Sequence, residues 1–129
     1  MPDVRVLIVD DEPDIRATVS AMLEIEGYEV DEAANGADAL RLVESDGGGI
    51  ALVITDLIMP EMRGTELARR LRQRFPALKV LLVSGYTEDA IMRQRTFDAE
   101  TVFLEKPFTP DALVQVVRRT LNGETAGTA

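Results

Sequence analysis

The sequence contains no histidine and no cysteine among its 129 residues. Without histidine, the chain cannot build a Ser-His-Asp triad, use an imidazole as a general base or bind a metal through imidazole. Without cysteine, it has no disulfide and no zinc–thiolate site, which is typical of a reducing compartment. Any metal that this chain binds must therefore be a hard ion held by oxygen ligands.

Long apolar runs and basic clusters are absent as well. No run approaches the length of a membrane span, and the N-terminus lacks the pattern of a signal peptide. Lys and Arg number 14 against 23 Asp and Glu, giving a net charge of -9. This charge disfavours nucleic acids and anionic membranes as direct partners. We therefore expect a soluble, cytoplasmic protein that contacts neither nucleic acid nor membrane.

The length and the 46% hydrophobic content suit one globular domain with a proper core. We expect this domain to span residues 1–121. The small and polar residues 122–129 predict a flexible C-terminal tail.

Five short stretches predict β-strands. Continuous apolar runs are typical of strands buried on both faces, and four such runs occupy residues 4–9, 50–54, 80–83 and 102–104. The fifth stretch, "YEVDEA" from Tyr28, alternates apolar and acidic residues, which predicts a half-exposed strand near an edge of the sheet.

Helical patterns separate these strands. Pro13 and Pro110 suit the first position of a helix, and Thr109 is a favourable N-cap. The apolar faces of four helices comprise Ile15, Val19, Met22 and Leu23; Ala37, Leu40 and Val43; Leu67, Ala68 and Leu71; and Leu113, Val116, Val117 and Leu121. A fifth helix, over residues 87–97, has a narrow apolar stripe. This alternation of strands and helices predicts an open α/β sheet of parallel strands.

Polar residues gather where the predicted strands end. The endings are Asp10 and Asp11, Thr55 and Asp56, Ser84 and Gly85, and Glu105, Lys106 and Pro107. Because ligands of such sheets bind at the carboxyl ends of the strands, we expect carboxylates, a hydroxyl and an ammonium to converge there. Clustered carboxylates suit a hard divalent cation, foremost Mg²⁺. Such a cation and Lys106 would neutralise a phosphoryl group while a carboxylate attacks it, giving an aspartyl phosphate.

Taken singly, these residues also have structural interpretations. Asp10 and Asp11 suit a turn and a helix cap, and Asp56 suits a turn after a strand. A lone Ser84 beside Gly85 is more often a polar residue at the exit of a strand, and a lone Lys106 is more often a solvated lysine. If all these residues had only structural roles, four independent coincidences would have placed them at one edge of the sheet. We therefore reject the interpretation that all of them are structural.

Four motifs, "LIVDDE", "ITDLIMPEMRG", "VSGY" and "LEKPF", carry a resemblance to a known family. In their order and intervals, over about residues 4–121, the sequence resembles the two-component receiver domains of the CheY-like superfamily. The resemblance implies a flavodoxin-like fold: a doubly wound, five-stranded parallel sheet of order 2-1-3-4-5 with five helices. "VSGYTEDA" and "FLEKPFTPDAL" resemble receivers of hybrid histidine kinases or single-domain regulators.

The resemblance also implies a function. A receiver takes a phosphoryl group from a histidine kinase or a histidine phosphotransferase, and it catalyses only its own phosphorylation and slow dephosphorylation. Asp56 would be the phosphoacceptor. Asp11 and Asp56 would bind Mg²⁺ directly, together with the backbone carbonyl of Ile58, and Asp10 would act mostly through water.

Further implied roles concern the switch. Ser84 and Phe103 stand at the positions of the family's switch hydroxyl and switch aromatic, and Lys106 would contact the phosphoryl group. The bond before Pro107 would be cis, which proline permits. A downstream protein would contact the face formed by the helix over residues 87–97, the fifth strand and the last helix.

Two other functions compete with this one. A haloacid-dehalogenase-like phosphatase also uses Mg²⁺, an Asp and a Lys, but it expects a D-x-D pattern and a cap insertion. Here Asp10, Asp11 and Glu12 are consecutive, and the length leaves no room for a cap. A phosphorylation-independent pseudo-receiver would have lost an acid, the switch hydroxyl or the lysine, and none is missing. The phosphorylatable receiver is therefore favoured.

Overall fold

The computed structural model of the chain describes residues 4–46, 49–57, 59, 61–84, 102–105 and 108–122. For Ser84 and Phe103 it describes the main chain alone. In chain order the elements are β1 (Arg5–Val9), α1 (Pro13–Ile25), β2 (Glu29–Ala33), α2 (Gly36–Asp46), β3 (Ile50–Asp56), α3 (Gly64–Arg74), β4 (Lys79–Ser84), β5 (Val102–Glu105) and α5 (Pro110–Leu121).

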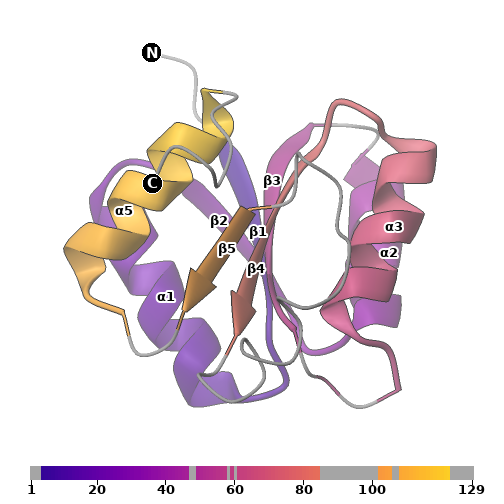
Figure 1. Cartoon of the computed structure of the whole chain (residues 1–129), viewed down its shortest axis with the longest axis horizontal. Coiled ribbons are helices and arrows are strands. Elements are labelled where there is room, and N and C mark those ends of the chain that lie inside the picture. The colour runs from indigo at the N-terminus through magenta and orange to yellow at the C-terminus, as the bar shows by residue number, and fades with distance from the viewer. Residues whose placement is uncertain are drawn as a thin grey trace.

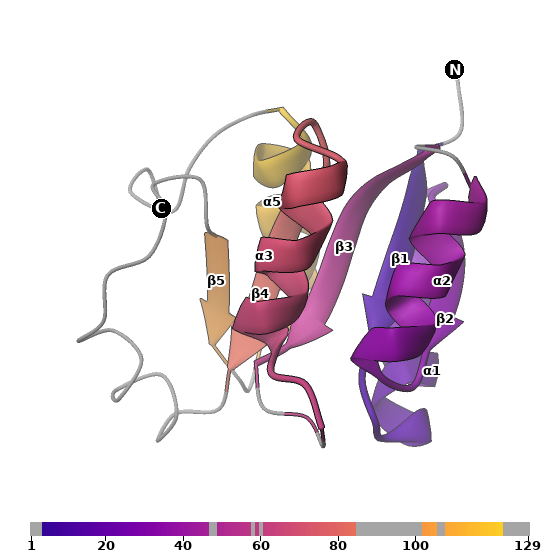
Figure 2. The ribbon, with the colours of Figure 1, turned by 90° about the vertical axis from the view of Figure 1, so that its right-hand side faces the viewer.

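The strands form one parallel sheet of order β2-β1-β3-β4-β5. Helices α1 and α5 cover one face, and α2 and α3 cover the other (Figure 1). Seen from the side of α2 and α3, β2 and β5 lie at opposite borders of the sheet (Figure 2). The predicted fold and strand order are thus confirmed. The predicted helix over residues 87–97 and the tail beyond Asn122 lie outside the described residues.

Alternate residues of each central strand enter two different cores. From β1, Val6 and Ile8 join a cluster with α1 and α5, whereas Leu7 and Val9 join a cluster with α2 and α3. All four side chains are at most 2% exposed. This two-sided burial explains the continuous apolar runs, because side chains on both faces of these strands enter a core. Full burial of each such side chain stabilises the fold by roughly 1.5–3 kcal/mol.

The predicted strand boundaries are too short at several ends. β3 continues from the predicted end at residue 54 to Asp56, since Thr55 pairs with Val9 of β1 and Asp56 with Val83 of β4. β5 likewise continues to Glu105, which pairs with Ser84. The apolar pattern stops before the hydrogen-bonded ladder does, because polar side chains can stand at the end of a buried strand.

The helix starts follow the predicted chemistry at α5. The hydroxyl Oγ1 of Thr109 accepts a hydrogen bond of 3.1 Å from the N–H of Ala112, and Pro110 occupies the first helical position. At α1, Pro13 also stands first, but the N-cap Glu12 makes no side-chain cap. Among the described helices, none is long and apolar enough to cross a membrane.

Candidate functional site

Asp10 and Asp11 follow β1 directly and differ in exposure. Asp10 is 4% exposed, whereas Asp11 is exposed. The N–H of Asp10 donates to the carbonyl of Ala33 at 3.1 Å, which continues the pairing of β1 with β2. Its carboxylate Oδ1 accepts from the N–H of Glu12 at 2.9 Å. Asp10 therefore does stabilise the turn before α1, as one structural interpretation predicted.

Asp56 is the last residue of β3 and is 9% exposed. The adjacent β1 and β3 bring it to Asp10 and Asp11, so that one carboxylate oxygen from each of the three residues lies within 4.8 Å of the others. The convergence predicted from the strand ends is confirmed for these three side chains. Oxygen ligands at this spacing are the donor set that Mg²⁺ takes in proteins.

The loop after Asp56 is held close to the start of α3. The N–H of Gly64 donates to the carbonyl of Leu57 at 2.8 Å. A Cβ atom at position 64 would overlap the carbonyl oxygen of Asp56 and lie 3.1 Å from the Cα of Leu57. Glycine at position 64 therefore permits the close approach of the backbone at Asp56 and Leu57. In the same loop, Glu61 adopts a positive φ of 71°, which side chains disfavour.

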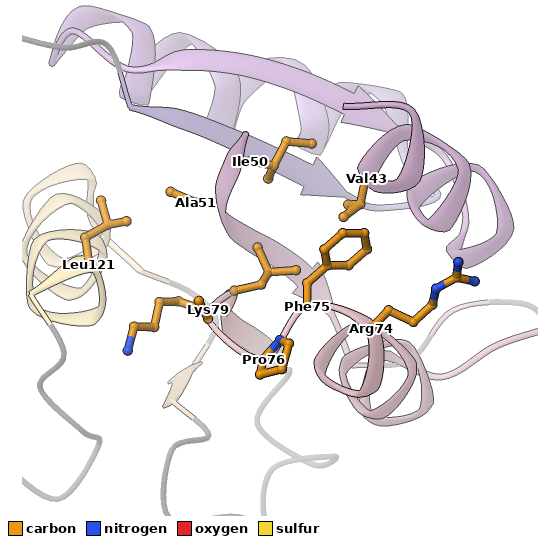
Figure 3. Close-up of a pocket in the computed structure, with 10 residues that line it drawn as sticks. Val43, Ile50, Ala51, Arg74, Phe75, Pro76, Lys79 and Leu121 are labelled. Carbon is orange, nitrogen blue, oxygen red and sulfur yellow. The ribbon is translucent and has the colours of Figure 1, made fainter. Parts of the chain in front are cut away.

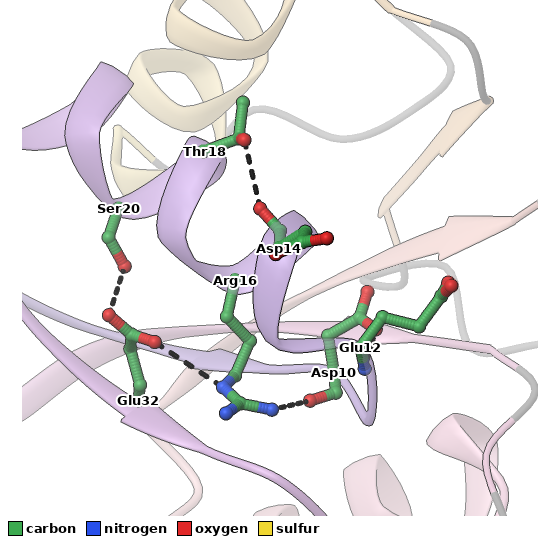
Figure 4. A network of polar contacts seen from close by, with 7 residues as sticks. All are labelled: Asp10, Glu12, Asp14, Arg16, Thr18, Ser20 and Glu32. Atoms are coloured by element: carbon green, nitrogen blue, oxygen red, sulfur yellow. Dashed lines mark hydrogen bonds and ion pairs between the residues drawn. The ribbon is translucent and has the colours of Figure 1, made fainter.

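An arginine also supports the turn beside the carboxylates (Figure 4). Arg16 of α1 donates from Nη1 to the backbone carbonyl of Asp10 at 2.7 Å and from Nε to Oε1 of Glu32 at 3.3 Å. The other oxygen of Glu32 accepts from the hydroxyl of Ser20 at 3.0 Å. The sequence analysis missed this network. The sequence feature that could have indicated it is the position of Arg16, a cation in the first turn of a helix, where the helix dipole disfavours positive charge.

The remaining predicted site residues are described in part or not at all. The main chain of Ser84 ends β4 and pairs with β5 at Glu105, so both stand at the same edge of the sheet as Asp56. Phe103 lies within β5. Three further predicted residues lie outside the described residues: Ile58, Lys106 and Pro107.

A hollow of about 510 Å³ lies at the opposite end of the sheet (Figure 3). Its lining includes Ile50 and Lys79, the first residues of β3 and β4, together with Phe75 and the charged Arg74. Arg74 forms an ion pair of 2.6 Å with Glu44. Among the residues that the structure describes, no Asp or Glu side chain lines this hollow. The carboxylate cluster of Asp10, Asp11 and Asp56 lies at the other end of the sheet, at the carboxyl ends of β1 and β3.

The sheet order and the acidic cluster after β1 and β3 define a CheY-like flavodoxin fold with its polar site at the expected edge. The sequence matches the response regulator receiver domain over residues 6–118. The chain belongs to this family, whose members are signalling modules of two-component systems and are generally not classical enzymes.

Individual relatives are of two kinds. The chain is 43% identical over 116 residues to sensor kinase CckA of Brucella abortus (strain 2308). The aligned region covers 90% of this chain and 12% of that protein. It is 33% identical over 117 residues to the response regulator receiver protein CpdR of the same organism, covering 91% of this chain and 96% of CpdR. The chain spans little more than half the length of two further relatives.

Solved structures agree with the fold. The crystal structure of the chemotaxis protein CheY4 of Vibrio cholerae matches with a TM-score of 0.77 at 29% identity, covering 92% of this chain and 99% of that chain. A CheY-like receiver domain protein of Methanospirillum hungatei JF-1 matches with a TM-score of 0.80 at 31% identity, covering 94% and 95%.

Proposed function

We propose that this receiver accepts a phosphoryl group on Asp56 from a phosphohistidine of a histidine kinase or histidine phosphotransferase. The observation that carries the proposal is the cluster of three carboxylates, with oxygens within 4.8 Å, at the end of β1 and β3. The phosphohistidine lies outside these 129 residues, since they contain no histidine. The relatives include a sensor kinase and a receiver protein matched over almost its whole length, so both settings suit the proposal.

Asp10, Asp11 and Asp56 are the residues that would hold Mg²⁺, with the backbone carbonyl of Ile58 as a further ligand. Their fit rests on the donor set: hard oxygen atoms at the spacing of one shared ion. When bound, Mg²⁺ supplies positive charge that offsets the charge of the carboxylates and of the phosphoryl oxygens.

In the proposed transfer, a carboxylate oxygen of Asp56 attacks the phosphorus and forms the new O–P bond. The P–N bond to the imidazole breaks, and its electron pair stays on the imidazole nitrogen. No general base is required, because the attacking group is already an anion. The carboxylate stands at the end of a strand buried on both faces, so its position is fixed before the donor arrives.

The surface that the proposed switch changes lies at the border of the sheet formed by β5. In this proposal, Lys106 contacts the phosphoryl group, and Ser84 donates a hydrogen bond to it. Phe103 then moves into the space that Ser84 leaves. The peptide bond between Lys106 and Pro107 is proposed to be cis. A downstream protein then contacts the face of β5, α5 and residues 87–97. We place this exchange in the cytoplasm, where the partners of two-component signalling act.

Mass spectrometry after incubation with acetyl phosphate and Mg²⁺ tests the proposal. We expect a single phosphoryl group on Asp56, no labelling when Mg²⁺ is chelated, and none in Asp56→Asn. Asp111→Asn, which changes an exposed carboxylate in the first turn of α5, is the matched control and should be labelled normally. Stable, complete labelling of the Asp56→Asn protein at another aspartate would refute the assignment.

A further inference from the structure

We propose that Arg16 is a positioning residue for the metal site, and that Glu32 and Ser20 hold it in place. This inference rests on the proposed Mg²⁺ site and adds three residues that do not touch the ion. The geometry that carries it is the hydrogen bond of 2.7 Å from Nη1 of Arg16 to the backbone carbonyl of Asp10.

The hydrogen bond from Arg16 completes the fixation of Asp10. The N–H of Asp10 is bound to Ala33 of β2, and one carboxylate oxygen is bound to the N–H of Glu12. Arg16 binds the carbonyl, so that both backbone polar groups and one carboxylate oxygen of Asp10 have a partner. The carbonyl of Asp10 belongs to the peptide group that leads into Asp11. Its orientation therefore determines where the carboxylate of Asp11 stands relative to Asp56.

Arg16 acts through this hydrogen bond rather than through its charge. Its guanidinium is paired with Glu32 at 3.3 Å, so the two formal charges cancel. An unpaired guanidinium beside three carboxylates would compete with a divalent cation for them. The pairing with Glu32 reduces this competition and keeps the donor in place.

Ser20 fixes Glu32 in turn. Its hydroxyl is buried at 5% exposure and donates to Oε2 of Glu32, while Oε1 faces Arg16. Arg16 and Ser20 are four residues apart on α1, so they lie on the same face of the helix. One carboxylate of the edge strand β2 thus bridges two side chains of α1, and the view in Figure 4 follows this chain of contacts from Ser20 to Asp10.

Lysine cannot replace this arginine. The planar guanidinium donates from Nε and Nη1 in two fixed directions at once, whereas an ammonium on a flexible stem has no such fork. The variant Arg16→Lys therefore keeps the charge and disturbs the position. Residues that orient metal ligands typically contribute 10-fold or more to metal affinity.

The test compares Mg²⁺ dissociation constants, measured by titration calorimetry, with melting temperatures of the metal-free proteins. We expect Arg16→Lys and Glu32→Gln each to weaken Mg²⁺ binding about 10-fold, with a double variant no weaker than either alone, because both act on one contact. Ser20→Ala is a milder variant that should weaken binding less. Arg69→Lys, in an exposed pair with Glu66 on α3, is the matched control and should bind Mg²⁺ as the wild type does.

The outcomes separate this inference from the function on which it rests. If the wild type binds Mg²⁺ and Arg16→Lys and Ser20→Ala bind it with the same affinity, the positioning role is overturned and the proposed site remains intact. An equal loss in Arg69→Lys, or a loss that only follows the melting temperature across all variants, would also overturn it. A wild-type protein that does not bind Mg²⁺ would refute the metal site itself, and the inference with it.

Discussion

Three carboxylates lie close together at each end of the sheet, and the two clusters differ in their pairing with cationic side chains. At the amino end, the guanidinium of Arg5 reaches all three: Asp46 at 2.5 Å, Glu29 at 3.3 Å and Asp31 at 3.7 Å. The hydrogen bond with Asp46, followed by that with Glu29, raises the pKa of Arg5 above its usual value. This cluster contains its own counter-ion.

At the carboxyl end, the described residues provide no such counter-ion for two of the three carboxylates. Among the residues that the structure describes, no cationic side chain pairs with the carboxylate of Asp10 or Asp11, and Arg16 donates to a carbonyl instead. The difference separates two uses of acidic residues. A cluster neutralised from within is part of the scaffold, whereas a cluster open to an external cation is suited to binding.

The largest expected effect comes from displacing the backbone at the carboxyl end. Gly64→Ala would force the loop away from Asp56 and Leu57, because its Cβ has no room. We expect a loss of about 2 kcal/mol in the free energy of unfolding and a smaller stabilisation by Mg²⁺, measured by urea unfolding with and without the ion.

Gly36→Ala is the control for that experiment. A Cβ there would meet Met62, with the flexible end of its side chain, the Sδ atom, at 2.6 Å. Because this side chain can move aside, we expect a smaller loss than in Gly64→Ala. Equal losses in the two variants would show that the contact with the Asp56 carbonyl has no special weight.

The amino end is tested by removing its cation. Arg5→Met keeps the apolar stem but leaves Asp46, Glu29 and Asp31 to repel one another. We expect lower stability at low salt and a markedly smaller loss in 1 M NaCl, where the screening length falls to about 3 Å. The response to Mg²⁺ should remain that of the wild type. A loss of stability independent of salt would indicate packing by the stem instead of charge.

Backbone strain also distinguishes the two ends. The turn before β2 places Gly27 at its positive φ of 96°, whereas the loop after β3 places Glu61 at 71°. Glu61→Gly should therefore raise the free energy of unfolding by about 1 kcal/mol. In the helical control Glu24→Gly, we expect a loss of about 1 kcal/mol. Destabilisation by Glu61→Gly would contradict the assignment of strain.

The smallest effect concerns pH and an exposed pair on α3. Hydrogen bonds from Arg69, and then from Arg70, lower the pKa of Glu66 from 4.5 to about 2. A carboxyl whose pKa is lowered by folding stabilises the fold above its unfolded pKa and loses this contribution as the pH falls. The stability difference between wild type and Glu66→Gln should thus shrink between pH 4.5 and pH 2 in urea unfolding. A constant difference over this range would exclude the linkage.

The sequence was sufficient to predict the sheet and its three carboxylates, because both follow from pattern and topology. A continuous run such as that of β1 indicates burial on both faces, and parallel strands bring their ends to one edge. The contacts of Arg5 and Arg16 were not predictable in this way. They depend on how α1 and α2 lie against β1 and β2. The hydrophobic periodicity of a sequence does not show which charged side chains of different elements will contact each other.

The conformation of Glu61 illustrates a second limit. Glu61 adopts its positive φ between Leu57 and Gly64, which a backbone hydrogen bond joins. Glutamate gives no signal for that conformation, unlike the glycine of the turn before β2. A prediction from local residue preference therefore misses this conformation.

The pairing of β1 with β3 has a consequence for how the chain folds. Val9 lies opposite Thr55, so the step that completes this ladder also brings Asp10 to Asp56 from a distant part of the sequence. Repulsion between the two carboxylates opposes the same step that closes the central core. Divalent cations should therefore speed the folding of this protein as well as stabilise its product.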